Sequence, residues 1–133
     1  MNAARPAPGV VLARCADVPE GGAIVLSFRA EGASFSLLLA RRGSAVFAYE
    51  NICPHAAYPL QGADGRLLVQ EGRYVVCHAH GASFALDGGA CAGGPCNGEA
   101  LTRFAIEVRD GAVFTPRSSR AGPNPARDRD DGA

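Results

Sequence analysis

Two short clusters of cysteine and histidine constrain this chain more than any other feature of its sequence. The first is Cys53-Pro54-His55 and the second is Cys77-His78-Ala79-His80. Each cluster offers one thiolate and at least one imidazole that are close enough to bind the same centre. The segment between the clusters contains a predicted hairpin, and a hairpin brings the two loops at its base side by side. The sequence therefore predicts one metal-binding site built from two converging loops.

Short apolar runs separated by turn signals predict strands along most of the chain. The runs are residues 10–14, 23–29, 34–40, 44–49, 67–70, 73–77, 83–86, 103–109 and 112–115. The clearest hairpin signal is Asp110-Gly111, because this pair suits the primed turns that match strand twist. Residues 90–100 are rich in glycine and predict a loop, and no segment of convincing length has helical periodicity. We expect an all-β fold.

Composition divides the chain into one domain and two tails. Residues 1–9 are small and proline-rich, and we expect them to be a flexible N-terminus. Residues 10–115 contain all the predicted strands and form the expected domain. Residues 116–133 contain almost no apolar side chain, so they cannot bury enough surface to offset the entropy of ordering. We predict a disordered tail there.

Charge and hydropathy argue against two kinds of partner. Thirteen basic residues balance thirteen acidic ones, so the chain has no net field to attract nucleic acid or an anionic membrane. No apolar run approaches the roughly 18 residues of a membrane span, and residues 1–10 lack a signal-peptide stretch. We expect a cytoplasmic protein, and in that compartment paired cysteines bind metal or do chemistry more often than they form disulfides.

With their flanking residues, the two clusters resemble the Rieske family. The family pattern is C-x-H and then, after a spacer, C-x-x-H-G, which the chain has at Cys53-x-His55 and Cys77-x-x-His80-Gly81. Residues 47–52 and 81–84 also match, and residues 93–95 resemble the proline-bearing loop that covers the cluster. The resemblance extends over about residues 8–115. The spacer is about four residues longer than in family ferredoxins, and we place the excess around residues 61–66, where loop length costs little.

The resemblance implies a fold, a cofactor and a function. The fold is the Rieske fold of small stacked antiparallel sheets, with the ligand loops as a subdomain. The cofactor is one 2Fe–2S cluster held by Cys53 and Cys77 on one iron and by His55 and His80 on the other. The implied function is ferredoxin-like: the chain takes single electrons from a reductase and passes them to a terminal oxygenase.

The chain is expected to be a carrier and not an enzyme. A terminal Rieske oxygenase needs a second iron held by two histidines and a carboxylate. Only three histidines are present, two of them are already used, and the chain is short for a catalytic domain. A membrane-anchored respiratory subunit is disfavoured because no anchor is present.

Further departures from the respiratory type predict a low redox potential. That type has a serine and a tyrosine that donate hydrogen bonds to sulfur, where this chain has Ala82 and Phe84. It also has a disulfide between its two loops, at positions that are Tyr58 and Ala79 here. Without those donors the reduced state is less stabilised, so we expect a midpoint toward the low end of the Rieske range, about −150 mV.

Several alternatives stay open at this stage. The site could be structural zinc in a binding module, and the chain could be a small Rieske subunit of a larger oxidoreductase of the nitrite-reductase kind. His78 could replace His80 as a ligand, although the family spacing and Gly81 favour His80, which leaves His78 as a solvent-facing loop residue. Residues 56–60 could be a docking patch for a redox partner or could pack beneath the cluster.

The remaining cysteines have no assigned role in the family pattern. Cys91 and Cys96 could be extra ligands, a disulfide or ordinary loop thiols, and we expect ordinary thiols, with Cys96 packed near the cluster as a small buried residue. Cys15 is expected to lie on a strand in the core.

Overall fold

The computed structural model describes residues 3–54, 59–62, 65–78, 81–94, 96 and 98–117. Short strands and a single 3₁₀ turn make up the regular structure of these residues. In chain order they are β1 Val11–Arg14, η1 Cys15–Asp17, β2 Ala23–Ala30, β3 Ala33–Arg42, β4 Ala45–Glu50, β5 Leu68–Gln70, β6 Tyr74–Val76, β7 Ser83–Ala85, β8 Cys91–Gly93, β9 Glu107–Arg109 and β10 Ala112–Phe114. The all-β expectation is confirmed.

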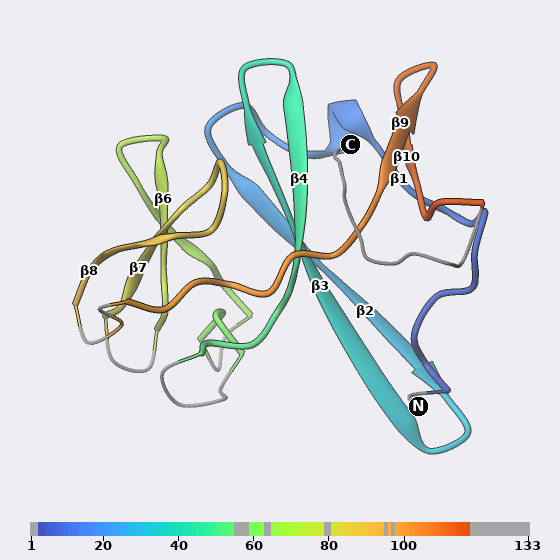
Figure 1. The fold of residues 1–133 in the computed structure, drawn as a ribbon, viewed down its shortest axis with the longest axis horizontal. Coiled ribbons are helices and arrows are strands. Elements are labelled where there is room, and N and C mark those ends of the chain that lie inside the picture. Colours follow the sequence, from blue (N-terminus) through green and yellow to red (C-terminus); the bar gives the residue numbers. More distant parts are fainter. Residues whose placement is uncertain are drawn as a thin grey trace.

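The strands form three antiparallel sheets, with the β2–β4 sheet in the middle (Figure 1). Its strand order is β2-β3-β4. On one side lies the sheet β5-β6-β7-β8, and on the other lies the sheet β1-β10-β9. This arrangement of small stacked sheets is the one expected for the Rieske fold.

The central sheet is buried on both faces because its side chains alternate between two cores. Leu38 pairs with Val25 and Tyr49 across the sheet, and these three side chains pack toward the β5–β8 side. The next residue along β3, Leu39, faces the opposite core. Alternation with period two along each strand places matched apolar residues on both faces. This explains why residues 37–40 form a continuous apolar run.

Tight turns that contain glycine connect the strands of three hairpins. Asp110 and Gly111 both have positive φ, of 51° and 76°. Two positive φ values are the requirement of a type I′ turn, which matches the right-handed twist of paired strands. Glu31-Gly32 and Glu71-Gly72 have the same signature. Antiparallel hairpins are present at all three places, including the one predicted at Asp110-Gly111.

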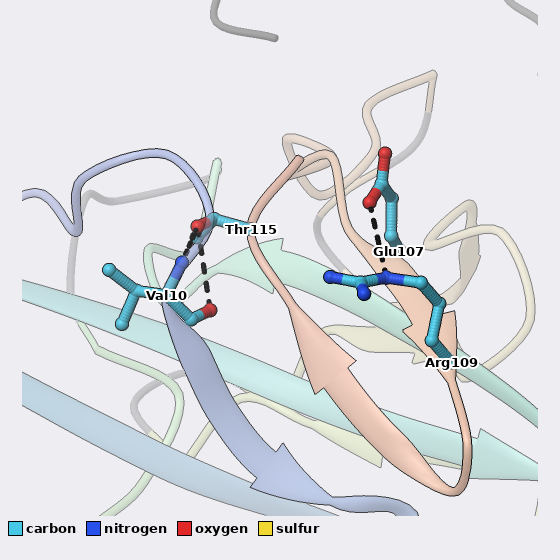
Figure 2. A network of polar contacts seen from close by, with 4 residues as sticks. All are labelled: Val10, Glu107, Arg109 and Thr115. Carbon is cyan, nitrogen blue, oxygen red and sulfur yellow. Dashed lines mark hydrogen bonds and ion pairs between the residues drawn. The ribbon is translucent and has the colours of Figure 1, made fainter. Parts of the chain in front are cut away.

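The third sheet joins the two ends of the described chain (Figure 2). Figure 2 shows the Val10 amide, which donates to Thr115 Oγ1 at 2.8 Å. The Thr115 hydroxyl donates to the Ala7 carbonyl at 2.6 Å. On the same sheet Arg109 lies 4.1 Å above the Phe114 ring and 3.7 Å from a Glu107 carboxylate oxygen. Thr115 is buried, so its hydroxyl satisfies backbone groups that water does not reach.

Three expectations differ from the structure. The alternating run 103–109 is a strand only over Glu107–Arg109; the residues before it lie along β4, where the Phe104 amide donates to the Ala48 carbonyl. The predicted loop 90–100 contains β8. Cys15 begins the 3₁₀ turn and is half-buried, so it is not a core strand residue. The expected tail lies outside the described residues from position 118 onward, as do residues 1 and 2.

No helix in the described part of the chain is long and apolar enough to span a bilayer.

Candidate metal centre

Cys53 and Cys77 lie in one buried cluster of side chains between the central sheet and the β5–β8 sheet. Both are fully buried, and neither belongs to a disulfide. Cys53 follows β4, and Cys77 directly follows β6. The two predicted thiolate ligands are therefore placed in the same part of the core by strands from different sheets. The two predicted imidazole ligands, His55 and His80, lie outside the described residues.

The first ligand segment is closed at its base by the side chain of Asn51. Its carbonyl Oδ1 accepts a hydrogen bond from the Leu60 amide at 2.9 Å. Its Nδ2 donates to Gln61 Oε1 at 2.7 Å and to Ser36 Oγ at 3.0 Å. Asn51 is 2 % exposed, so these bonds form away from solvent. The segment between Asn51 and Leu60 contains Cys53 and, outside the described residues, His55.

The second ligand segment is closed by backbone hydrogen bonds. The Cys77 amide donates to the Ala82 carbonyl at 2.7 Å, and the Gly81 amide donates to the Cys77 carbonyl at 2.9 Å. The two segments are also joined directly, because the His78 amide donates to the Leu60 carbonyl at 3.1 Å. These backbone hydrogen bonds bring the two ligand segments together, as the sequence predicts.

His78 is exposed, as expected for a loop residue that is not a ligand. Its imidazole ring lies flat against Gly62, where an added Cβ would stand only 2.8–2.9 Å from the ring atoms. A larger residue at position 62 would therefore push the exposed His78 ring away from this place. Gly62 belongs to the part of the spacer where we place the extra residues, and there the Gly62 amide donates to the Arg66 carbonyl at 3.0 Å.

The glycine-rich segment after β7 contacts the second ligand segment and contains a disulfide. Cys91 and Cys96 are bonded to each other, so the expectation of ordinary loop thiols is wrong. Cys96 is fully buried, with its Sγ 3.6 Å from the Ser83 carbonyl oxygen. A Cβ on Gly94 would lie 2.8 Å from the Gly81 carbonyl oxygen. The sequence could not indicate this pairing, because a separation of five residues suits a loop, a ligand pair and a disulfide equally.

The surroundings of the thiols are apolar. Ala82 and Phe84 are fully buried in the same cluster as Cys53 and Cys77, and neither side chain has a hydrogen-bond donor. Leu60 is buried as well, so this residue of segment 56–60 packs in the core and is not part of a docking patch. Residues 56–58 lie outside the described part. Low polarity and few donors are the conditions that disfavour added negative charge at a cluster.

A buried tyrosine fixes the β7 turn to β4 beneath the same core. The Tyr49 hydroxyl donates to the Leu86 carbonyl at 2.8 Å and accepts from the Gly88 amide at 2.7 Å. Burial raises the pKa of Tyr49 to about 12, while the Gly88 hydrogen bond and the Arg103 charge act in the opposite direction. Tyr49 is therefore neutral at ordinary pH and holds two backbone groups that would otherwise be unpaired.

The donor set fits a Rieske cluster on this chain's own residues. Two buried thiols outside any disulfide can become the two thiolate ligands of one iron. The two imidazoles predicted for the other iron come from segments whose bases the structure brings together. Thiolates buried in an apolar core need a cationic centre to offset the cost of their charge, which is what ferric iron supplies.

A comparison with family models decides the family. The model of the Rieske [2Fe-2S] domain matches residues 9–109. The chain belongs to the Rieske [2Fe-2S] family. The cofactor of this Rieske domain is accordingly one 2Fe–2S cluster of the Rieske type. The sequence matches none of the curated proteins with which it was compared.

Solved structures confirm the fold of this Rieske domain. The ferredoxin of Sphingomonas yanoikuyae B1 is similar, with 24 % identity, a TM-score of 0.60 and coverage of 83 % of this chain and 99 % of that one. The ferredoxin of carbazole 1,9a-dioxygenase from Nocardioides aromaticivorans IC177 has 22 % identity, a TM-score of 0.60 and coverage of 83 % and 99 %. The terminal oxygenase from the same organism has 20 % identity and a TM-score of 0.66, over 91 % of this chain and 33 % of that one.

The sequence predicts Cys53 and Cys77 as ligands but does not indicate the side-chain contacts that support their segments. Asn51 enters the sequence argument only as one of the residues flanking the first motif, yet its side chain makes three hydrogen bonds at the site. An asparagine two residues before the first cysteine could have signalled such a role, because a short amide side chain often bonds nearby backbone. The disulfide had no comparable signal.

Proposed function

We propose that this Rieske domain is a one-electron carrier, with Cys53 and Cys77 as the ligands of one iron and His55 and His80 as the ligands of the other. The single observation that carries the proposal is the pair of fully buried thiols at the bases of two joined ligand segments. The bound cluster supplies reversible acceptance of one electron. The protein residues hold the cluster, limit its contact with water and set the energy of its reduced state.

The partners that fit this role are a reductase that delivers electrons and a terminal oxygenase that receives them. Support comes from the similarity to Rieske ferredoxins over almost their whole length. One similar ferredoxin is known in complex with the oxygenase of carbazole 1,9a-dioxygenase. In the sequence in hand, His78 is the histidine left over after the two cluster motifs, so a second iron site of the two-histidine type has too few ligands.

A low midpoint potential belongs to the same proposal. The buried side chains of Ala82 and Phe84 offer no hydrogen bond to the sulfur atoms of the cluster. We expect a midpoint near −150 mV, the low end of the Rieske range. A redox titration followed by EPR measures it, and a clearly positive midpoint would contradict this part of the proposal.

The ligand assignment is tested by replacing two histidines that are two positions apart. The wild-type protein, purified without oxygen, should be reddish-brown and give a Rieske EPR signal after reduction. His80→Ala should abolish that signal, because one iron loses an imidazole ligand. His78→Ala is the matched control and should retain it. A wild-type signal in His80→Ala, or a colourless zinc-replete wild type, would contradict the proposal.

A larger oxidoreductase that contains this chain as a small subunit is the second candidate. The observation that favours it is the TM-score of 0.66 with a part, 33 %, of a longer terminal oxygenase chain. Native mass measurement of the protein from its own cells separates the two. A carrier should run as a free protein, whereas a subunit should co-purify in a fixed ratio with larger chains.

We propose that the carrier works in the cytoplasm. The Cys91–Cys96 disulfide is the observation that opposes this location, because cytosolic thiols are normally kept reduced. Alkylation of the protein in intact cells before lysis decides the point. Modified Cys91 and Cys96 would indicate a reducing compartment, and unmodified cysteines an oxidising one.

A further inference from the structure

The hydrogen bonds of Asn51 link the central sheet to both ligand segments. On one side, the Asn51 amide donates to the Ser36 carbonyl at 3.0 Å, which extends the pairing of β3 and β4 by one residue. On the other side, the Asn51 side chain bonds to Leu60 and Gln61. Leu60 in turn accepts from the His78 amide, next to Cys77. A continuous path of hydrogen bonds thus joins β3 to both cysteine-bearing segments.

The partners of Asn51 leave no freedom in how its amide is oriented. The Leu60 amide can only donate, so the atom that faces it must be the carbonyl Oδ1. The two hydrogens of Nδ2 then point to Ser36 Oγ and Gln61 Oε1. Every hydrogen-bonding group of this buried side chain except one lone pair is used. A carboxylate at this position would have no hydrogens to donate to Ser36 Oγ and Gln61 Oε1, and an apolar side chain of the same size would lose all three bonds.

We infer that Asn51 is a positioning residue for the iron–sulfur cluster: it closes the first ligand segment at Leu60, whose carbonyl accepts from the His78 amide of the second segment, and so sets the orientation of the Cys53 thiolate. This inference rests on the proposed function, because it assigns a role toward the cluster. Supporting residues behind metal ligands typically change metal affinity by about 10–100-fold when they are removed. Asn51 acts through Leu60 and Gln61 and does not itself bind iron.

The test compares two variants that each remove one partner from the same amide. Gln61→Ala removes one of the two side-chain bonds toward the first ligand segment and leaves the Leu60 bond in place, and Ser36→Ala removes the side-chain bond to β3 while the backbone bond between Asn51 and Ser36 remains. Gln61→Ala should release iron to a chelator about 3-fold faster and shift the g values of the reduced cluster, a fraction of the 10-fold effect of losing a whole supporting residue. Ser36→Ala should behave as wild type in both measurements.

Complete loss of the amide should give the larger effect. Asn51→Ala should release iron about 10-fold faster than wild type and broaden the EPR signal. Tyr49→Phe is the stability control, because it also loses buried hydrogen bonds near the core but none to a ligand segment. At an equal decrease in thermal midpoint, Tyr49→Phe should keep the wild-type g values and iron release.

A readout on the apoprotein separates this inference from the proposed function. Without the cluster, Asn51→Ala should speed amide hydrogen exchange at Leu60 and His78, and Ser36→Ala should not. If wild-type protein gives no Rieske signal at all, the proposed function fails and this inference fails with it. If wild type gives the signal but Asn51→Ala and Gln61→Ala match it in g values and iron release, the inference alone is overturned. Equal changes in Ser36→Ala and Gln61→Ala would overturn it too.

Discussion

The central sheet and the ligand region achieve their order by different physical means. In the β2–β4 sheet, paired strands bury apolar side chains on both faces, and many equivalent contacts share the stabilisation. In the ligand region, a few single contacts hold the segments in place. They are the Asn51 side-chain hydrogen bonds, the contact of His78 with Gly62 and the Cys91–Cys96 disulfide. A substitution in the sheet should therefore lower global stability, and one in the ligand region should change the cluster itself.

The largest expected effect tests this contrast with two neighbours on β3. Leu38 and Leu39 are both fully buried but face opposite cores. Leu39→Ala should cost about 3 kcal/mol of unfolding free energy through lost burial and a cavity, or about 10 °C in thermal midpoint, with an unchanged EPR signal. Leu38→Ala should cost a similar amount and also accelerate iron loss, since its core contains both thiols. Identical EPR signals and iron retention in the two variants would contradict the claim that only the core on the Leu38 side supports the cluster.

Tyr49 tests whether polar contacts at the edge of the site contribute as much as a buried leucine. Tyr49→Phe leaves the Leu86 carbonyl and the Gly88 amide without their partner and should cost about 1–3 kcal/mol at neutral pH. Denaturant unfolding at pH 7 measures it. A loss below 0.5 kcal/mol, the usual range of a neutral surface substitution, would argue against these bonds.

The same residue predicts a pH dependence with a definite sign. Folding raises the pKa of Tyr49 from its ordinary 10 to about 12, so the neutral form is favoured in the folded state. The associated stability is fully present below pH 10 and is lost as pH rises through 12, a loss of about 2–3 kcal/mol. Tyr49→Phe should lack this part of the decline between pH 10 and pH 12.

The disulfide should stabilise only the region that contains it. Closing a loop of this length contributes about 2 kcal/mol in the chain-entropy model. The double substitution Cys91→Ala and Cys96→Ala should lower the free energy of local opening of the β7–β8 region by about that amount and speed hydrogen exchange there, with little change in β2 and β3. Cys15→Ser, a half-buried cysteine outside the disulfide, is the control and should stay within about 0.5 kcal/mol of wild type. Faster exchange throughout the central sheet would contradict the separation of the two regions.

The smallest effect concerns electronic tuning inside the ligand region. Ala82→Ser combined with Phe84→Tyr would introduce hydroxyl donors beside the cluster sulfur atoms. If each donor favours the reduced cluster by about 0.5–1 kcal/mol, the pair should raise the midpoint by about 40–90 mV for one electron. Ala85→Ser, in the same strand, should leave the midpoint unchanged. A redox titration compares the three proteins, and no shift in the double variant would contradict the role given to Ala82 and Phe84.

Much of the fold was predictable from sequence because it depends on local rules. The hairpins at Glu31-Gly32, Glu71-Gly72 and Asp110-Gly111 follow from glycine's freedom at positive φ and from the apolar runs beside them. The error at residues 103–109 has a physical cause as well. Alternating apolar and polar residues indicate only that one face of the segment is buried. Here that face packs along β4, but the backbone makes no continuous series of strand hydrogen bonds with it.

For the site, the sequence by itself determined the chemistry: which thiols and imidazoles are available, in which order, and hence the Rieske family. It could do so because ligand spacing is local along the chain. Only the tertiary structure decided how that chemistry is supported, through Asn51 reaching Leu60, His78 lying on Gly62 and Cys91 bonding to Cys96. These contacts depend on where separate segments meet in space. The identity of an asparagine, a glycine or a cysteine in the sequence does not show which distant residue it contacts in the fold.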